Sequence, residues 1–250
     1  MPLKSLVRNH FPGLANALRL NVRYRKQIYG VHPDGFQQSV NIWDTIQTAY
    51  GYNRSKAENA CVDQNGNPIP WYTYPAIEFL SGLSFAGKDV WEFGCGNSTA
   101  WWAARARSVR SAESDSAWFE IVKARHIPNA QVDLVDGSDQ AAYAGSIHRP
   151  QIKFDVIVVD GLVENLCRLA CAKEAMTVLN PGGMIVLDNS DRLPKSCEAL
   201  SLGGFTEIPF NGFAPLNAEP SRTSVFIRAA MDFQKLPHQW AVGGVTASWE

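Results

Sequence analysis

The chain has 250 residues, of which 46% are hydrophobic, and its formal net charge is −1. This length and composition fit a globular protein with one hydrophobic core. The near-neutral charge excludes a strongly basic protein, so no nucleic-acid partner is expected. Five cysteines are present without a Cys-x-x-Cys pair. That arrangement argues against a zinc knuckle or a redox motif and predicts reduced thiols in a cytoplasmic protein.

Residues 1–70 carry no regular hydrophobic period and are predicted to form a basic, helical or irregular extension that caps the following domain. Six basic residues precede the first acidic residue, Asp34. They alternate with apolar side chains, so residues 1–28 would suit contact with an anionic membrane surface. A solvated helix face is favoured over that membrane contact.

Residues 71–228 alternate short apolar runs with helical stretches, and residues 229–250 form a tail without a clear period. Continuous apolar strands that alternate with helices are typical of a parallel sheet covered on both faces. The predicted strands are 89–93, 108–112, 130–135, 154–159, 184–187, 205–210 and 223–227, the last two forming a hairpin. The predicted helices are 76–83, 98–106, 117–124 and 163–179.

Acidic residues and a glycine loop follow the first five predicted strands. In chain order the strands are followed by Gly94-Cys95-Gly96, Glu113, Asp136, Asp160 and Asp188-Asn189. Ligands of parallel sheets bind beyond the carboxyl ends of the strands. These groups therefore predict one binding site along one edge of the sheet.

The glycine loop predicts close contact with a nucleoside ligand. Gly94 and Gly96 have no Cβ, so the backbone can turn sharply and approach a ligand. Glu113 lies 19 residues after Gly94, a spacing that places its carboxylate where it can accept both hydroxyls of a ribose. Thr99 stands where a dinucleotide site has its third glycine, which favours a ligand without a pyrophosphate.

Three segments resemble the motifs of class I, S-adenosylmethionine-dependent methyltransferases. They are residues 90–99, 154–161 and 179–189, and the likeness covers about residues 71–228. The resemblance implies a Rossmann-like, doubly wound α/β fold with a mostly parallel seven-stranded sheet and an antiparallel last strand. It also implies an enzyme that transfers methyl groups and takes S-adenosylmethionine as its cofactor.

The same resemblance implies a role for each residue of the cofactor site. Glu92 and the 94–96 loop would flank the methionine end of S-adenosylmethionine, Glu113 the ribose, and Asp136 or Ser138 the adenine edge. The full predicted set is Glu92, Gly94, Cys95, Gly96, Ser98, Glu113, Asp136, Ser138 and Asp160.

Asp160, Asp188 and Asn189 resemble the metal ligands of the cation-dependent O-methyltransferases that act on catechols and caffeoyl esters. By that resemblance they would hold Mg²⁺, which prefers hard oxygen ligands, and Asp160 and Asp188 would be the catalytic residues. Val163 departs from the pattern, because the catechol enzymes have a catalytic lysine there. The alternative is that Asp160 belongs to a simple turn and that Asp188 and Asn189 form a cap or an Asx-turn.

The predicted reaction is methyl transfer from S-adenosylmethionine to a hydroxyl oxygen of a small-molecule acceptor, assisted by a divalent cation. Three alternatives stay open: an aminopropyl transferase on the same fold, a non-catalytic nucleoside-binding module, and a nicotinamide oxidoreductase. The sequence leaves the acceptor unidentified and leaves a homodimer open.

Overall fold

The computed structural model describes residues 45–161, 167–228, 230–237 and 241–242. Residues 1–28, for which membrane contact was considered, lie outside the described residues. A compact unit begins at Ile46 and contains the whole sheet, whereas the domain boundary at about residue 70 stays a prediction. None of the helices within the described ranges is long and apolar enough to cross a membrane.

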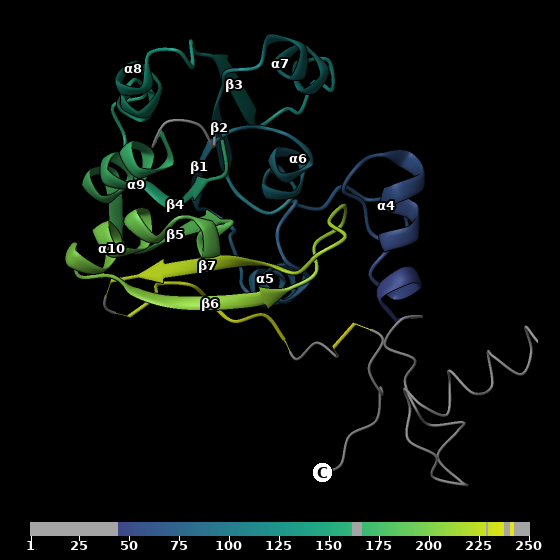
Figure 1. Cartoon of the computed structure of the whole chain (residues 1–250). Coiled ribbons are helices and arrows are strands. Elements are labelled where there is room, and N and C mark those ends of the chain that lie inside the picture. The colour runs from purple at the N-terminus through teal and green to yellow at the C-terminus, as the bar shows by residue number, and fades with distance from the viewer. Residues whose placement is uncertain (1–44, 162–166, 229, 238–240, 243–250) are drawn as a thin grey trace, which may run out of the picture. The chain divides into compact units, whose positions relative to one another are not determined.

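The sheet has seven strands in the order β3-β2-β1-β4-β5-β7-β6 (Figure 1). Strands β3, β2, β1, β4 and β5 pair in parallel, and β7 runs antiparallel to both β5 and β6. The predicted Rossmann-like sheet with an antiparallel last strand is therefore confirmed. The strand order reverses between β1 and β4, and such sheets bind ligands at the carboxyl ends beside this reversal.

The strands agree closely with the prediction. They are β1 Asp89–Phe93, β2 Ser108–Glu113, β3 Ala130–Leu134, β4 Phe154–Val159, β5 Leu179–Asp188, β6 Thr206–Gly212 and β7 Ser221–Ile227. Several boundaries differ by one or two residues, and the largest difference is at β5, which begins at Leu179 instead of residue 184. Leu179 pairs with Phe154, and the register shifts before Val156, so residues 180–183 are accommodated as an irregularity inside the strand.

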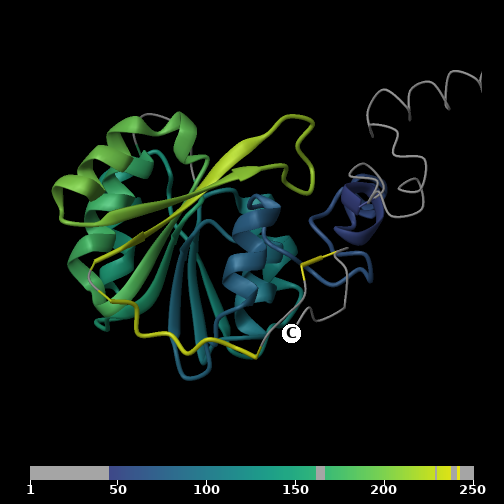
Figure 2. The same cartoon turned by 90° about the horizontal axis from the view of Figure 1, so that it is seen from below.

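Helices cover both faces of the sheet. They are α4 Tyr52–Glu58, α5 Tyr74–Ser81, α6 Asn97–Ala103, α7 Ser116–Lys123, α8 Gln140–Gly145, α9 Cys167–Val178 and α10 Pro194–Leu202, with short turns η1 Thr45–Ala49, η2 Ser146–His148 and η4 Ser190–Arg192. Helices α8, α9 and α10 lie on one face, and α5 and α6 lie on the other (Figures 1 and 2). Helices α8 and α10 were not predicted. Helix α10 begins at Pro194, where the missing N–H of proline removes no helical hydrogen bond.

Strand alternation assigns each side chain of the central strands to one of these two layers. Trp91 and Phe93 of β1 belong to the core under α8, α9 and α10. Val90 of β1, Val158 of β4 and Val186 of β5 belong to the core under α5 and α6. Since side chains alternate with a period of two, the even-numbered positions face α5 and α6 along β1, in β4 from Val156 and in β5 from Met184. Phe154, which precedes the register shift in β4, lies in the opposite core.

Candidate functional site

Three acidic side chains meet at the carboxyl edge of the sheet, on the face covered by α5 and α6. Glu92 pairs with Val158 across β1 and β4, and Val158 pairs with Val186 across β4 and β5. Asp160 and Asp188 follow two residues further along and so share the face of Glu92. Two of the acids are buried, with Glu92 1% and Asp188 4% exposed.

The glycine loop passes very close to the end of β4. Gly94 has a φ of 96°, a left-handed conformation that favours glycine. A Cβ built on Gly94 would lie 3.0 Å from the carbonyl oxygen of Asp160. Gly96 donates its N–H to the hydroxyl of Thr99 at 3.0 Å, which caps the start of α6. Thr99 therefore has a capping role at the position where a dinucleotide site has its third glycine.

Glu113 connects the end of β2 to the glycine loop. Its Oε2 accepts the N–H of Cys95 at 3.0 Å, and its Oε1 accepts the N–H groups of Ser114 at 2.7 Å and Asp115 at 2.9 Å. A carboxylate offers about four acceptor positions, so three are already used. The structure therefore fixes the carboxylate firmly and leaves room for about one hydroxyl, rather than the two expected from the spacing.

Glu92 lies beneath the first turn of α6. Burial raises the pKa of its carboxyl to about 7, although hydrogen bonds from the hydroxyls of Thr99, Ser98 and Ser111 oppose the shift. The negative charge of Asp160 adds to the rise. A nearby positive group would favour ionisation of Glu92, and the amino group and sulfonium of S-adenosylmethionine would supply such charges.

Asp160 and Asp188 both bind fixed partners. Asp188 accepts the hydroxyl of Thr223 at 2.6 Å, from the residue paired with it across β5 and β7. Asp160 accepts a hydrogen bond from Arg168 at 3.2 Å and keeps 25% of its side chain exposed. Burial raises the pKa of Asp160 to about 6 despite Arg168. Burial, followed by the charge of Asp160, raises the pKa of Asp188 well above its ordinary value.

These residues do not fit the predicted Mg²⁺ site. Arg168 also donates to the side-chain oxygen of Asn189 at 3.2 Å, so a cation bound by Asp160 and Asn189 would compete with a guanidinium for the same oxygens. Within the described ranges, no group of three His, Cys, Asp or Glu side chains could hold a metal ion. The prediction of Mg²⁺ is therefore not supported.

Four residues outside the predicted set of site residues lie near the site. Tyr72 and Cys61 are buried and lie close enough to Asp160 and Asp188 that these charges add to the raised pKa of each. Trp118 donates its indole N–H to the carbonyl of Cys95 at 2.5 Å and so lies beside the glycine loop. Arg168 is the fourth.

Two members of the predicted set lie apart from the acid cluster. Asp136 is exposed, and its carboxylate accepts the N–H of Ser138 at 2.8 Å. Asp139 then caps α8. This short turn is formed after β3, near the outer edge of the sheet. The roles of Asp136 and Ser138 at the adenine edge remain predictions.

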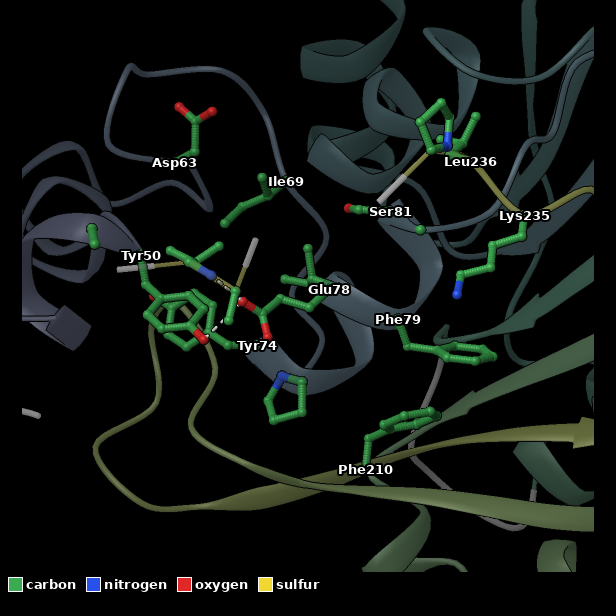
Figure 3. A pocket seen from close by; sticks show the side chains of 17 residues that line it. Tyr50, Asp63, Ile69, Tyr74, Glu78, Phe79, Ser81, Phe210, Lys235 and Leu236 are labelled. Atoms are coloured by element: carbon green, nitrogen blue, oxygen red, sulfur yellow. Dashed lines mark hydrogen bonds between the residues drawn. The ribbon is translucent and has the colours of Figure 1, made fainter. Parts of the chain in front are cut away.

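A separate pocket of about 570 Å³ lies along α5 (Figure 3). Its lining comes from α5 and the residue after it, from β6, from residues 49, 50, 63 and 69, and from residues 235–237 and 241–242. Glu78 accepts the hydroxyl of Tyr50 at 3.0 Å and the N–H of Val242 at 2.9 Å, which ties both flanking segments to α5. No residue of the predicted cofactor set is among the lining residues, so this pocket is distinct from the strand-end site.

Comparison with known proteins identifies the class of enzyme. Residues 91–190 match the family model described as a methyltransferase domain. That match covers β1 to the end of β5, including the glycine loop and the acids after β2, β4 and β5. Together with the strand order, this match supports the predicted enzyme class, an S-adenosylmethionine-dependent methyltransferase with the class I fold. A search of curated proteins finds no match.

Several solved structures share the fold at low sequence identity. An rRNA methylase from Streptococcus thermophilus is 16% identical, with a TM-score of 0.47, over 65% of this chain and 97% of the other. A precorrin-6y C5,15-methyltransferase from Geobacter metallireducens is 14% identical, with a TM-score of 0.49, over 62% and 87%. A ribosomal protein L11 methylase from Lactobacillus delbrueckii subsp. bulgaricus is 18% identical, with a TM-score of 0.42, over 57% and 70%.

These names correct the expected acceptor. The prediction of a small-molecule acceptor and no nucleic acid is contradicted, because an rRNA methylase and a ribosomal protein methylase are among the similar structures. The error has a physical reason. A net charge of −1 describes the whole chain and does not exclude a local basic surface.

Proposed function

We propose that this enzyme methylates a hydroxyl oxygen, and that S-adenosylmethionine lies over the carboxyl ends of β1 and β2. The proposal is supported by the hydrogen bond between the glycine loop and Glu113, in which the N–H of Cys95 donates to the carboxylate at 3.0 Å. Gly94 lets the backbone approach a ligand closely. The fourth acceptor position of Glu113 is suited to a ribose hydroxyl.

The remaining groups suit the methionine end of the cofactor. Glu92 is a buried carboxylate that would pair with the positive charge of the amino group. The hydroxyl of Ser98, at the start of α6, lies close enough to Glu92 to lower its pKa. The bound cofactor supplies an electrophilic methyl group and leaves as a neutral thioether.

Asp160 is the group best placed to accept a proton from the acceptor. It is partly exposed, with 25% of its side chain accessible, whereas Asp188 is buried and bound by Thr223. In the proposed step, the acceptor oxygen forms a bond to the methyl carbon as the carbon–sulfur bond breaks. The hydroxyl proton passes to the Asp160 carboxylate. Asp188 then serves to hold the edge of the site, not to accept the proton.

Calorimetry tests the cofactor site. Glu113→Gln should weaken S-adenosylmethionine binding by about 10- to 100-fold, since a hydrogen bond to a charged group contributes about 1.5–3 kcal/mol. Glu120→Gln removes one charge from the exposed surface of α7 and should leave the affinity unchanged. Equal affinities in the wild type and Glu113→Gln would refute the site. Preferential binding of NAD, or turnover of decarboxylated S-adenosylmethionine, would favour the alternative enzymes.

Release of S-adenosylhomocysteine tests the chemistry. The acceptor panel should include hydroxyl compounds, RNA and protein, so that acceptors of different sizes are tested. With an acceptor in hand, Asp160→Asn should lower kcat by about 100-fold or more, with little change in cofactor affinity. Undiminished kcat in Asp160→Asn would rule out Asp160 as the proton acceptor.

A further inference from the structure

Arg168 brings a buried positive charge to the acid cluster from the opposite layer of the fold. It belongs to α9, whose neighbouring residues Cys171 and Ala172 pack in the core under α8, α9 and α10. The arginine is only 4% exposed. Its guanidinium therefore reaches over the edge of the sheet from one layer toward acids that face the other.

The guanidinium binds four oxygens at the ends of two strands. After β4 it donates to the carbonyl of Gly161 at 3.0 Å and to the carboxylate of Asp160 at 3.2 Å. At the end of β5 it donates to the carbonyl of Asp188 at 2.8 Å and to the side chain of Asn189 at 3.2 Å. One planar group thus fixes the ends of β4 and β5 relative to each other.

The two carboxylates at these strand ends need a positive charge beside them, as the ligands of a metal site do. Two carboxylates close together repel each other unless a positive charge lies near. A guanidinium is permanently charged and carries its donors in a fixed plane. Asp160 and Asn189, two of the three oxygen groups predicted to hold Mg²⁺, are engaged by Arg168 through their side chains, and Asp188 is engaged through its carbonyl.

We propose that Arg168 is the resident cation of this site and takes the place that a divalent metal has in the cation-dependent O-methyltransferases that the sequence resembles. Arg168 is a positioning residue, because it holds Asp160 and the carbonyl of Gly161 without itself touching the acceptor. The expected effect of Arg168 on turnover rests on the proposed function. The exclusion of a metal ion by Arg168 does not, and it can be tested without catalysis.

Metal binding by the protein alone is the primary test. Mn²⁺ is titrated into the wild type, Arg168→Ala, Arg168→Ala/Asp160→Asn and Lys173→Ala, with binding followed by electron paramagnetic resonance. Lys173 is an exposed residue of α9, so its variant controls for loss of charge from the same helix. We expect no site in the wild type or in Lys173→Ala. We expect one site in Arg168→Ala, at least tenfold tighter than any wild-type binding, and its loss in the double variant.

Three results of the Mn²⁺ titrations would overturn the proposal. One is Mn²⁺ binding by the wild type that the single variant Asp160→Asn abolishes. This result can be obtained even if the Arg168 variants do not fold. The second is an Arg168→Ala protein that melts cooperatively but binds Mn²⁺ no better than the wild type. Arg168→Lys keeps a positive charge and should also bind no metal. Acquisition of a site by that variant would be the third contradicting result, because a resident positive charge would then not exclude the ion.

Turnover supplies a second readout. The wild type should keep full activity in excess EDTA, and Arg168→Ala should lose at least tenfold in kcat and regain part of it when Mg²⁺ is added. Inhibition of the wild type by EDTA, reversed by Mg²⁺, would refute the proposal. If no acceptor is turned over under any condition, the proposed function fails, whereas the Mn²⁺ titrations still decide the role of Arg168.

Discussion

Replacing Gly94 by alanine tests how closely the glycine loop approaches β4. Gly94 has a φ of 96°, and an added Cβ would lie 3.0 Å from the carbonyl oxygen of Asp160 and 3.1 Å from the Cα of Gly161. Both neighbours are backbone, so they cannot move aside cheaply. Gly87 is a matched control, because its φ is 77° and an added Cβ would meet nothing within 4 Å.

The two variants differ in one physical contribution. A left-handed φ costs about 1–2 kcal/mol in a residue with a Cβ, and the smaller conformational entropy of the unfolded alanine chain returns about 0.4–1 kcal/mol. Gly87→Ala should therefore lower the free energy of unfolding by about 1 kcal/mol. Gly94→Ala adds an overpacking cost of about 1–3 kcal/mol, so its total should be about 3 kcal/mol.

Urea denaturation at pH 7, followed by tryptophan fluorescence, measures both variants, and calorimetry measures their affinity for S-adenosylmethionine. Gly94→Ala should be about 2 kcal/mol less stable than Gly87→Ala, the difference being the overpacking cost alone. It should also bind the cofactor more weakly, whereas Gly87→Ala should bind like the wild type. If the two variants are equally stable and bind equally well, the close approach of the loop to β4 has no energetic consequence and the reasoning fails.

Three further predictions concern single interactions. The pKa of Glu92 rises from 4.5 to about 7 in the fold, so the folded state holds this proton more tightly. The free energy of unfolding should therefore fall by up to about 3 kcal/mol between pH 4.5 and 8, while cofactor affinity rises over the same interval. Denaturation of Glu92→Gln should lose the Glu92 contribution and keep only the slope from Asp160 and Asp188, whose pKa values are also raised. An unchanged slope would exclude Glu92 as one of its sources. Thr223→Val removes the donor to Asp188 at 2.6 Å and should cost about 3 kcal/mol. Thr223→Ser should retain most of that stability, and equal losses would count against the hydrogen bond. A double-mutant cycle of Tyr50→Phe and Glu78→Gln should show a coupling of about 1 kcal/mol for their 3.0 Å bond, and strictly additive losses would contradict it.

The sequence by itself determined the sheet and the identity of the acids at its edge. Each strand is a local apolar run, and the residue that follows it must lie at that strand's end. Asp160 and Asp188 could therefore be assigned to one edge from their positions in the chain, whereas Glu92, inside β1, was assigned to the site through the resemblance. The glycine loop and Glu113 were predictable for the same reason, since both are defined by a strand end and a short spacing.

Only the tertiary structure decided what those acids bind. Arg168 lies in a helix of the other layer, and nothing in its local sequence signals that it meets oxygens from both β4 and β5. Three backbone donors occupy Glu113, and Asp136 lies exposed in its own turn. Local patterns specify which face a side chain takes, because alternation and helical period are properties of neighbouring residues. The partners of a buried charge come from chain segments that meet only when the layers pack, so their identity is settled by the fold.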